Sequence, residues 1–408
     1  MSSEVFNLKK GISRPGADEF RQGRYRLAQV ALASFALAFL ACLSLPPRCY
    51  TVDLQVEYLT ACALRDGLDL FTPLTDLSSL YFPVTTTNFP HPNPHLPILS
   101  LICLPLTLLP FPVLVPLWLA FNIVVLIAVG RRLGLSLLGS LALAAWPPLW
   151  FMLFIGQYEL LVLIFLLFGW QAGRESRDWQ AGFWLGLAAV VKLYPALLLL
   201  PYLIRHRYRV VSAAGLVIAL GQLGSLAVVG PAGFVRYYRE VLPEVTGGYV
   251  RTGLNSSPYG ALLRIFGGAT DVDPLVNLPV IVLPVSIILS TIAIVGLAKM
   301  RPEAGPVALL VALPSVWWYQ VILALPILVS LLREASIRRW ALLATAAASL
   351  VLPLVNLSSK ALTPILQSVG VRTATVACLM SVIQTIGFLW LLILTFKLYR
   401  RKTDDARI

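Results

Sequence analysis

Residues 96–132 read LPILSLICLPLTLLPFPVLVPLWLAFNIVVLIAVGRR, a stretch without a charged residue until it ends on Arg131 and Arg132. A helix needs about 20 apolar residues to cross the hydrocarbon core of a bilayer, and such runs recur along the chain. Of the 408 residues, 58% are hydrophobic and 12% are charged, whereas soluble domains average about 25% charged residues. The sequence therefore predicts an all-α polytopic transmembrane helix bundle of roughly 11 to 13 spans. Five prolines leave 96–130 open between one bent span and two short ones.

The net charge of +13 comes from basic residues that cluster in short segments between the apolar runs. Loops rich in Lys and Arg stay on the cytoplasmic side, so we place these clusters there, beside anionic membrane lipids, and expect no nucleic acid partner. We predict a multi-pass protein of the plasma (inner) membrane with a cytoplasmic N-terminus. Its parts are a basic leader (1–26), a single membrane domain (27–398) with outer loops at 46–95, 230–274 and 356–370, and a basic cytoplasmic tail (399–408).

Two apolar segments, 180–204 and 304–332, are too short for two full spans, although each begins and ends beside a basic cluster. Each has a break, at 192–195 and at 314–320. Non-helical backbone at membrane depth is tolerated only where it is buried in protein or lines a cavity, and broken helices form the binding sites of many transporters. The two breaks therefore predict a site between the membrane helices.

Asp53 begins the outer loop after the first apolar run and opens a predicted helix, with Thr51 as its N-cap and Gly67 at its end. This helix has one apolar stripe and is expected to lie in the membrane interface. Glu57 follows one turn later. An ionised carboxylate there suits a general base for a sugar hydroxyl, so Asp53 is the candidate catalytic residue and Glu57 a candidate substrate ligand. The spacing also suits two solvated acids that stabilise the helix N-terminus.

Further candidates lie in the outer segments and at the breaks. They are Gln157 and Glu159 in a tight hairpin, Lys192 and Tyr194 in the first break, Arg251, Asn255 and Arg264 in the loop at 230–274, and Trp317 and Tyr319 in the second break. A lysine can bind a lipid phosphate or extend to the headgroups without a ligand. Aromatic rings can stack on sugars or anchor the chain at the interface. All these residues are predicted to face outward, which indicates one outward-facing site.

Several of these segments resemble one family. Asp53 is followed by QVEYLTACALRDGLDLF (55–71) and FPHP (89–92), and later come Gly156-Gln157, AGFWLGLAAVVKLYP (181–195) and NSS (255–257). In this order they resemble the polyprenol-phosphate-mannose-dependent alpha-(1,2)-mannosyltransferase-like family of membrane proteins. The resemblance implies a glycosyltransferase-C fold, inversion at the anomeric carbon, Asp53 as the base, a polyprenyl-phosphate-sugar donor and a lipid or glycan acceptor. The chain departs from it at 314–319, which ends on Tyr319 where many relatives have a histidine.

We therefore expect an enzyme that moves a hexose, with mannose as the first candidate, outside the cytoplasm. Lys192, Arg251 and Arg264 would hold the departing phosphate, while Gln157 and Asn255 would contact sugar or phosphate oxygens. Because the sequence has no Walker loop, H-E-x-x-H or paired-cysteine motif, we expect neither a metal nor another cofactor. A transporter or flippase of lipid-linked sugars is the alternative, and it would need polar residues on both faces. In a third alternative, a non-catalytic scaffold, the outer polar residues would not converge.

Overall fold

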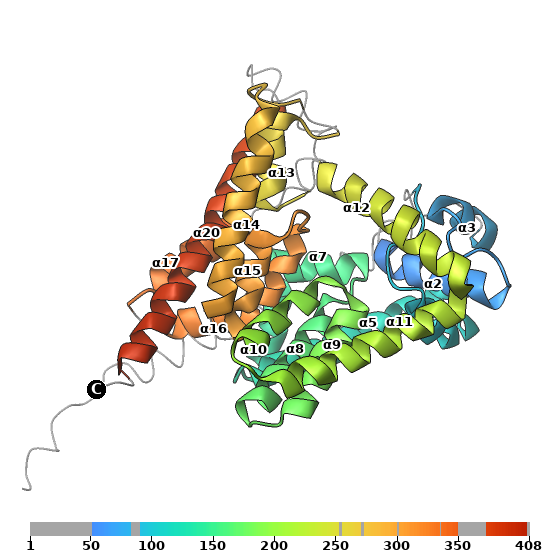
Figure 1. Ribbon diagram of the computed structural model, residues 1–408, viewed down its shortest axis with the longest axis horizontal. Coiled ribbons are helices and arrows are strands. Elements are labelled where there is room, and N and C mark those ends of the chain that lie inside the picture. Colours follow the sequence, from blue (N-terminus) through green and yellow to red (C-terminus); the bar gives the residue numbers. More distant parts are fainter. Residues whose placement is uncertain are drawn as a thin grey trace, which may run out of the picture.

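The computed structural model is a bundle of helices (Figure 1). It describes residues 51–82, 90–252, 255–270, 273–299, 302–334, 336–349 and 373–405, and these ranges contain no strand. The all-α prediction is therefore confirmed. The predicted leader, the first apolar run and the outer loop at 356–370 lie outside the described residues.

The first half of the chain runs from α2 to α11. Its elements are α2 (Val52–Arg65), α3 (Leu74–Tyr81), α4 (Ile98–Ile102), η2 (Leu104–Leu108), α5 (Phe111–Arg132), α6 (Leu137–Ala142), η3 (Leu143–Ala145), α7 (Pro147–Ile155), α8 (Glu159–Arg174), α9 (Asp178–Val191), η4 (Tyr194–Leu199), α10 (Leu200–Ile204) and α11 (Tyr208–Arg236). The second half continues with η5 (Tyr237–Val241), α12 (Leu242–Arg251), α13 (Pro258–Leu262), η6 (Leu263–Gly267), η7 (Pro279–Ile281), α14 (Val282–Lys299), η8 (Pro302–Ala304), α15 (Gly305–Ala312), η9 (Trp318–Ala324), α16 (Leu325–Arg333), α17 (Arg338–Ala348) and α20 (Thr373–Asp405).

Three helical segments in the described part of the chain are long and apolar enough to cross a membrane: Phe111–Arg132, Tyr208–Arg251 and Pro279–Lys299. A fourth is added if Leu137–Ala145 and Pro147–Ile155, which meet at 80°, form one broken span. These helices confirm a multi-pass membrane protein. They are fewer than the spans predicted for the whole chain: within the described residues other apolar runs form helices of 10–17 residues, and the first apolar run lies outside those residues. The open question at 96–130 is answered by one long helix, α5, preceded by the short α4 and η2.

Both predicted helix breaks are present. Helix α9 ends at Val191, and Lys192 is extended (φ −139°, ψ 134°) before the chain continues as η4. Helix α15 ends at Ala312, and Leu313 is extended (φ −73°, ψ 138°). Leu313 precedes Pro314, and the residue before a proline is driven out of the helical region by its ring. The second break is thus encoded locally.

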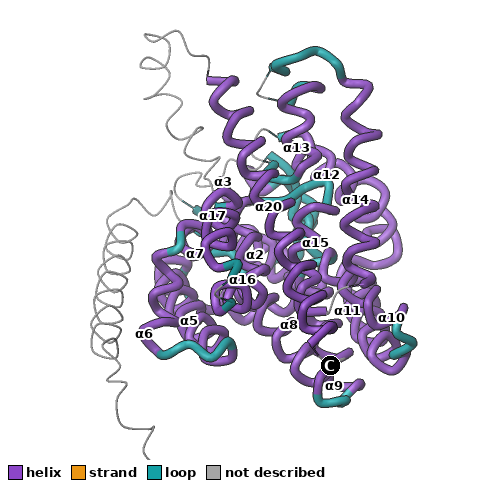
Figure 2. Tube along the Cα trace, turned by 90° about the vertical axis from the view of Figure 1, so that its left-hand side faces the viewer, coloured by secondary structure: helices purple, strands orange, loops and turns teal. Residues whose placement is uncertain are grey.

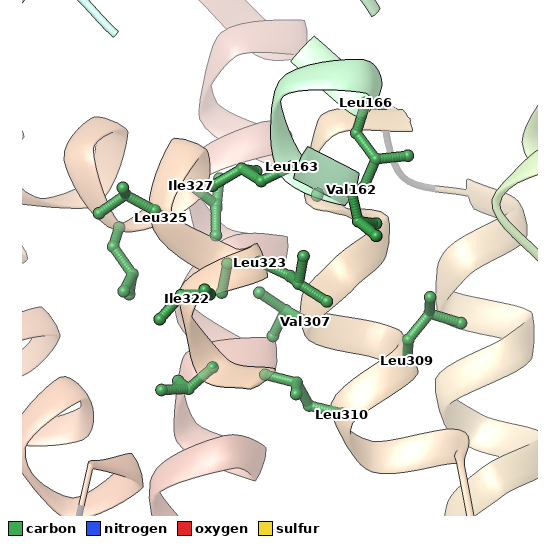
Figure 3. Close-up of a cluster of buried hydrophobic side chains, with 14 of the residues drawn as sticks. Val162, Leu163, Leu166, Val307, Leu309, Leu310, Ile322, Leu323, Leu325 and Ile327 are labelled. Atoms are coloured by element: carbon green, nitrogen blue, oxygen red, sulfur yellow. The ribbon is translucent and has the colours of Figure 1, made fainter. Parts of the chain in front are cut away.

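Apolar packing holds the short helices around the breaks. Figure 3 shows Val162, Leu163 and Leu166 of α8 beside a group from the second half of the chain. That group consists of Val307, Leu309 and Leu310 from α15, Ile322 and Leu323 from η9, and Leu325 and Ile327 from α16. Lipid is as apolar as these side chains, so their packing stabilises a membrane bundle through van der Waals contacts, each worth about 0.1–0.2 kcal/mol per atom pair. The second break is therefore held against α8, one of the helices that position the first.

Helices α9 and α11 pack side by side at unusually close range. A Cβ atom at Gly182 would lie 2.3 Å from the carbonyl oxygen of Val210, and one at Gly186 would lie 2.9 Å from that of Ala214. Small residues let membrane helices approach in this way. Figure 2 shows α12 and α13 towards one end of the molecule and α6, α9 and α10 towards the other. The close packing of α9 on α11 therefore fixes the position at which α9 ends and Lys192 follows.

Candidate active site

A cavity of about 220 Å³ lies where the two breaks meet the start of α2. It is lined by Val52, Asp53, Val56, Pro94, His95, Phe151, Ile155, Gln157, Lys192, Tyr249, Trp317 and Tyr319. These residues come from α2, α7, α12 and η9 and from the segments between helices. The cavity thus joins regions that are far apart in the sequence, and its lining has a polar wall and an aromatic wall.

The turn after α7 brings Gln157 to the start of α2. Gly156 has a φ of +78°, and a Cβ atom there would lie 2.9 Å from Cβ of Leu54 and 3.1 Å from Cα of Thr51. Glycine is favoured at such a position because it has no Cβ and adopts positive φ readily. The backbone N–H of Thr51 also donates to the carbonyl of Phe154 at 2.8 Å. Close contact between two backbones therefore sets the geometry of this wall.

Asp53, Gln157 and Lys192 form a chain of polar contacts along the wall. Nε2 of Gln157 donates to Oδ2 of Asp53 at 2.8 Å, and Nζ of Lys192 donates to Oε1 of Gln157 at 3.3 Å. Nζ of Lys192 also lies 3.5 Å from Oε1 of Glu159, whose side chain is fully buried. The cavity therefore has a carboxylate and an ammonium group at the two ends of one amide.

Burial raises the pKa of Asp53 to about 7, and it does so against the opposing effects of the Lys192 charge and the Gln157 hydrogen bond. A carboxylate with such a pKa is ionised in a large part of the molecules near neutral pH, yet is basic enough to accept a proton. Asp53 therefore has the properties that a general base requires.

A second polar cluster surrounds Glu57. Its carboxylate accepts hydrogen bonds from Nδ1 of His95 at 2.6 Å, the hydroxyl of Tyr158 at 3.0 Å and Nδ2 of Asn93 at 3.2 Å. Burial raises the pKa of Glu57, but the neighbouring His95 and these hydrogen bonds outweigh burial and leave the pKa below its ordinary value. Glu57 is therefore held as a carboxylate inside the protein.

The aromatic wall consists of Tyr249, Trp317 and Tyr319. The rings of Trp317 and Tyr319 stack with an interplanar angle of 11° and centroids 6.4 Å apart. Tyr249 meets Trp317 edge to face at 5.4 Å, and its hydroxyl lies 3.1 Å from Nε2 of His91. Aromatic faces of this kind offer an apolar surface beside the polar groups that a ligand needs.

Comparison with known proteins adds the decisive observation. The profile of glycosyltransferase family 87 matches residues 95–353, more than half of the chain. The chain belongs to glycosyltransferase family 87. It is therefore a membrane glycosyltransferase, and the predicted enzyme class is confirmed.

Two relatives of this glycosyltransferase are similar over much of its length. One, from Mycolicibacterium smegmatis, is 30% identical over 341 residues, which cover 78% of this chain and 80% of the relative. The other, from Mycobacterium tuberculosis, is 30% identical over 280 residues, covering 65% and 61%. Both are named polyprenol-phosphate-mannose-dependent alpha-(1-2)-phosphatidylinositol pentamannoside mannosyltransferase. No solved structure matches the chain.

Five predicted site residues of the glycosyltransferase line the cavity: Asp53, Gln157, Lys192, Trp317 and Tyr319. Glu159 lies behind Lys192 as its ion-pair partner, and Tyr194 begins η4 with a buried hydroxyl. The sequence analysis missed His95 and Tyr249. The only sequence signal that could have indicated His95 was Glu57, because a buried carboxylate needs hydrogen-bond donors. No sequence signal indicated Tyr249.

Glu57 and Asn255 require a correction. Glu57 is absent from the described residues that line the cavity, since its carboxylate faces three protein donors. Nδ2 of Asn255 donates to the carbonyls of Val250 and Pro314, while Oδ1 accepts from the N–H groups of Ser257 and Val316. The amide is therefore used by backbone groups, and it holds the second break instead of contacting a sugar.

The two arginines also require a correction. Arg251 is exposed at the end of α12, two residues after Tyr249. Two residues correspond to about 200° around a helix, so Arg251 points away when Tyr249 faces the cavity. Arg264 is fully buried in η6, which packs against α14 and α20. Neither arginine lines the cavity.

The predicted helix after Thr51 is confirmed, although its surroundings differ from the expectation. Thr51 occupies the N-cap position, but its side chain makes no capping hydrogen bond. Residues 54–63 are all buried. The apolar stripe expected to face the membrane interface therefore packs within the protein, because α3, α4 and η2 cover the helix.

Proposed function

We propose that this glycosyltransferase transfers a hexose, most readily mannose, from a polyprenyl-phosphate donor to a lipid or glycan acceptor at the extracytoplasmic face of the plasma membrane. The observation that carries the proposal is the pairing of Asp53 and Lys192 through Gln157 in one cavity. The names of the two relatives support the donor class and mannose as the first sugar to test.

The proposed reaction is a single displacement. The acceptor oxygen forms a bond to the anomeric carbon of the donor sugar, and its proton passes to the Asp53 carboxylate. The bond from the anomeric carbon to the phosphate oxygen breaks, and the electron pair leaves with the polyprenyl phosphate. The ammonium of Lys192 stabilises this charge, as cations placed at a developing anion do.

One carboxylate favours inversion. Asp53 is the single acidic residue among the described residues that line the cavity. Retaining glycosidases form a covalent intermediate with a second carboxylate, and the cavity offers none for that role. The sugar ring would lie against Trp317 and Tyr319, with its hydroxyls towards Gln157.

The proposed orientation follows from where the charges lie along α9. Lys192 follows the C-terminal end of this helix, whereas Arg177, Arg207 and Arg209 line one cavity at the N-terminal ends of α9 and α11. A helix of 14 residues is about 21 Å long. The basic residues therefore lie well away from the catalytic cavity, as cytoplasmic loops would. By the same rule the N-terminus is cytoplasmic.

The experiment measures transfer of radiolabelled mannose from polyprenyl-phosphate mannose by the full-length protein in nanodiscs. Asp53→Asn should lower the transfer rate at least about 1,000-fold, because the base is lost. Asp76→Asn is the matched control, since Asp76 is an exposed acid on α3, and it should leave the rate unchanged. Normal transfer by folded Asp53→Asn would overturn the base, while no transfer by the wild type from any polyprenyl-phosphate hexose would overturn the donor class.

A further inference from the structure

The buried cluster around Glu57 reaches the cavity through His95. The ring of His95 lies between two charged groups: Nδ1 is 2.6 Å from Oε1 of Glu57, and Nε2 is 3.3 Å from Nζ of Lys192. The backbone N–H of His95 donates to Oδ1 of Asn93 at 2.9 Å, and Nδ2 of the same Asn93 donates to Glu57. His95 is therefore fixed at both its backbone and its ring.

The two contacts select one tautomer of His95. An ammonium group has donors and no acceptor, and an ionised carboxylate only accepts. The Tyr158 hydroxyl, 2.7 Å from Nδ1 and 2.9 Å from Nε2, can donate or accept and is compatible with either tautomer. Glu57 and Lys192 therefore decide the tautomer: Nε2 presents its lone pair to Lys192, and Nδ1 carries the hydrogen that is donated to Glu57. The hydrogen bond made by one ring nitrogen commonly decides the state of the other in this way.

Lys192 needs such a contact because the buried carboxylate of Glu159 lies behind it. Glu159 is fully buried, neither of its carboxylate oxygens has a hydrogen-bond partner, and Nζ of Lys192 lies 3.5 Å from Oε1. This charge attracts the ammonium away from the cavity. Nε2 of His95 and Oε1 of Gln157, each 3.3 Å from Nζ, belong to residues that line the cavity. They oppose the attraction of Glu159.

We propose that Glu57 and His95 form a positioning pair, in which Glu57 sets the Nδ1–H tautomer of His95 and Nε2 of His95 holds the Lys192 ammonium towards the donor phosphate. His95 acts through Lys192 and takes no proton from the substrate. The inference rests on the proposed function, since it assumes that Lys192 meets the phosphate. At metal sites, the loss of an outer partner that orients a ligand residue typically lowers affinity about 10- to 100-fold, and we expect an effect at the lower end of this range here.

The test measures binding of undecaprenyl phosphate to the full-length protein in nanodiscs, with undecaprenol as the ligand that lacks the phosphate. Two substitutions of His95 separate its two nitrogens. The amide nitrogen of His95→Asn can replace Nδ1 and donate to Glu57, but no atom replaces Nε2. The amide oxygen of His95→Gln can reach the place of Nε2 and accept from Lys192.

We expect His95→Asn to weaken phosphate binding about 10-fold and His95→Gln to stay within about 3-fold of the wild type. Lys192→Met should weaken binding at least about 30-fold. Adding His95→Asn to Lys192→Met should change the affinity by less than about 2-fold, because the two residues act as one unit. Undecaprenol should bind all these proteins alike.

The outcomes separate the two hypotheses. Losses that multiply in the double variant, or equal losses for His95→Asn and His95→Gln, would overturn the positioning pair. Wild-type affinity of Lys192→Met would instead overturn the phosphate role on which the proposed function rests. If His95→Asn does not fold, as judged by size-exclusion chromatography, Glu57→Gln takes its place, with an expected loss of about 5-fold; unchanged affinity of the folded protein would then reject the pair.

Discussion

The two helix breaks have the same backbone geometry but place different kinds of side chain in the cavity. Each ends an α-helix with an extended residue and continues as a 3₁₀ helix, one after Lys192 and the other after Trp317. The first break delivers a charge, which three polar side chains contact directly. The second delivers aromatic rings, and there amide side chains bind the backbone instead. A charge placed inside a protein needs compensation at the side chain, whereas an aromatic ring needs only a backbone that holds its direction.

Among substitutions at the two breaks, the largest effect should come from removing the charge at the first break. Lys192→Met should lower kcat/KM for the donor about 100-fold or more, because the leaving phosphate loses its cation and Glu159 is left as an uncompensated buried charge. Lys192→Arg should recover part of the activity. Steady-state kinetics in nanodiscs provides the measurement, and a Lys192→Met enzyme within 3-fold of the wild type would show that the charge is not used.

A substitution that removes the support of the second break should lower the stability of the protein. Asn255→Ala leaves the N–H groups of Ser257 and Val316 without this partner, and unsatisfied buried groups cost about 1–3 kcal/mol each. We expect a clear decrease in melting temperature, measured by thermal unfolding in detergent, with activity lost in parallel. The control is Asn122→Ala on α5, whose Nδ2 donates once, to the carbonyl of Trp118. Equal melting temperatures for both variants would contradict the proposed role of Asn255.

The pH dependence of kcat/KM should change with a substitution at the first break and not with one at the second. Because the pKa of Asp53 is about 7, its ionised fraction falls as the pH decreases, and kcat/KM should decrease about 10-fold from pH 8 to pH 6. The Lys192 charge lowers this pKa. Lys192→Met should therefore shift the acid limb to higher pH, and Trp317→Phe should leave it in place. An acid limb at the same pH in all three enzymes would show that Lys192 does not influence the pKa of Asp53.

The smallest effect should come from trimming the aromatic wall. Trp317→Phe keeps an aromatic face and should raise the KM for the sugar substrate about 3-fold, whereas Trp317→Ala should raise it about 10-fold. The kcat should change less than the KM, since stacking holds the sugar before and during the reaction alike. A variant that loses kcat with unchanged KM would assign Trp317 to the chemical step.

Local signals account for the predicted site residues that line the cavity. Lys192 and Trp317 interrupt apolar runs beside prolines, and Asp53 opens a helix after a long apolar segment, so each position was visible within a few residues of sequence. The loop at 230–274 had no such signal. Its arginines were chosen for their charge alone, and the direction in which α12 turns decided against Arg251. Tyr249, which the same helix turns into the cavity, was overlooked for the same reason.

The sequence by itself determined the membrane class, the helix breaks and the candidate base, because hydrophobic length and proline act over short stretches of chain. Only the tertiary structure decided which polar groups meet. Glu57 lies 38 residues before His95, and His95 lies 97 residues before Lys192, so no periodicity relates them. The turn at Gly156 lies in close contact with the start of α2, and α9 packs on α11 through small residues. These long-range contacts place the imidazole of His95 and the ammonium of Lys192 in one cavity and hold the buried carboxylate of Glu57 against the imidazole, which is a property of packing in three dimensions.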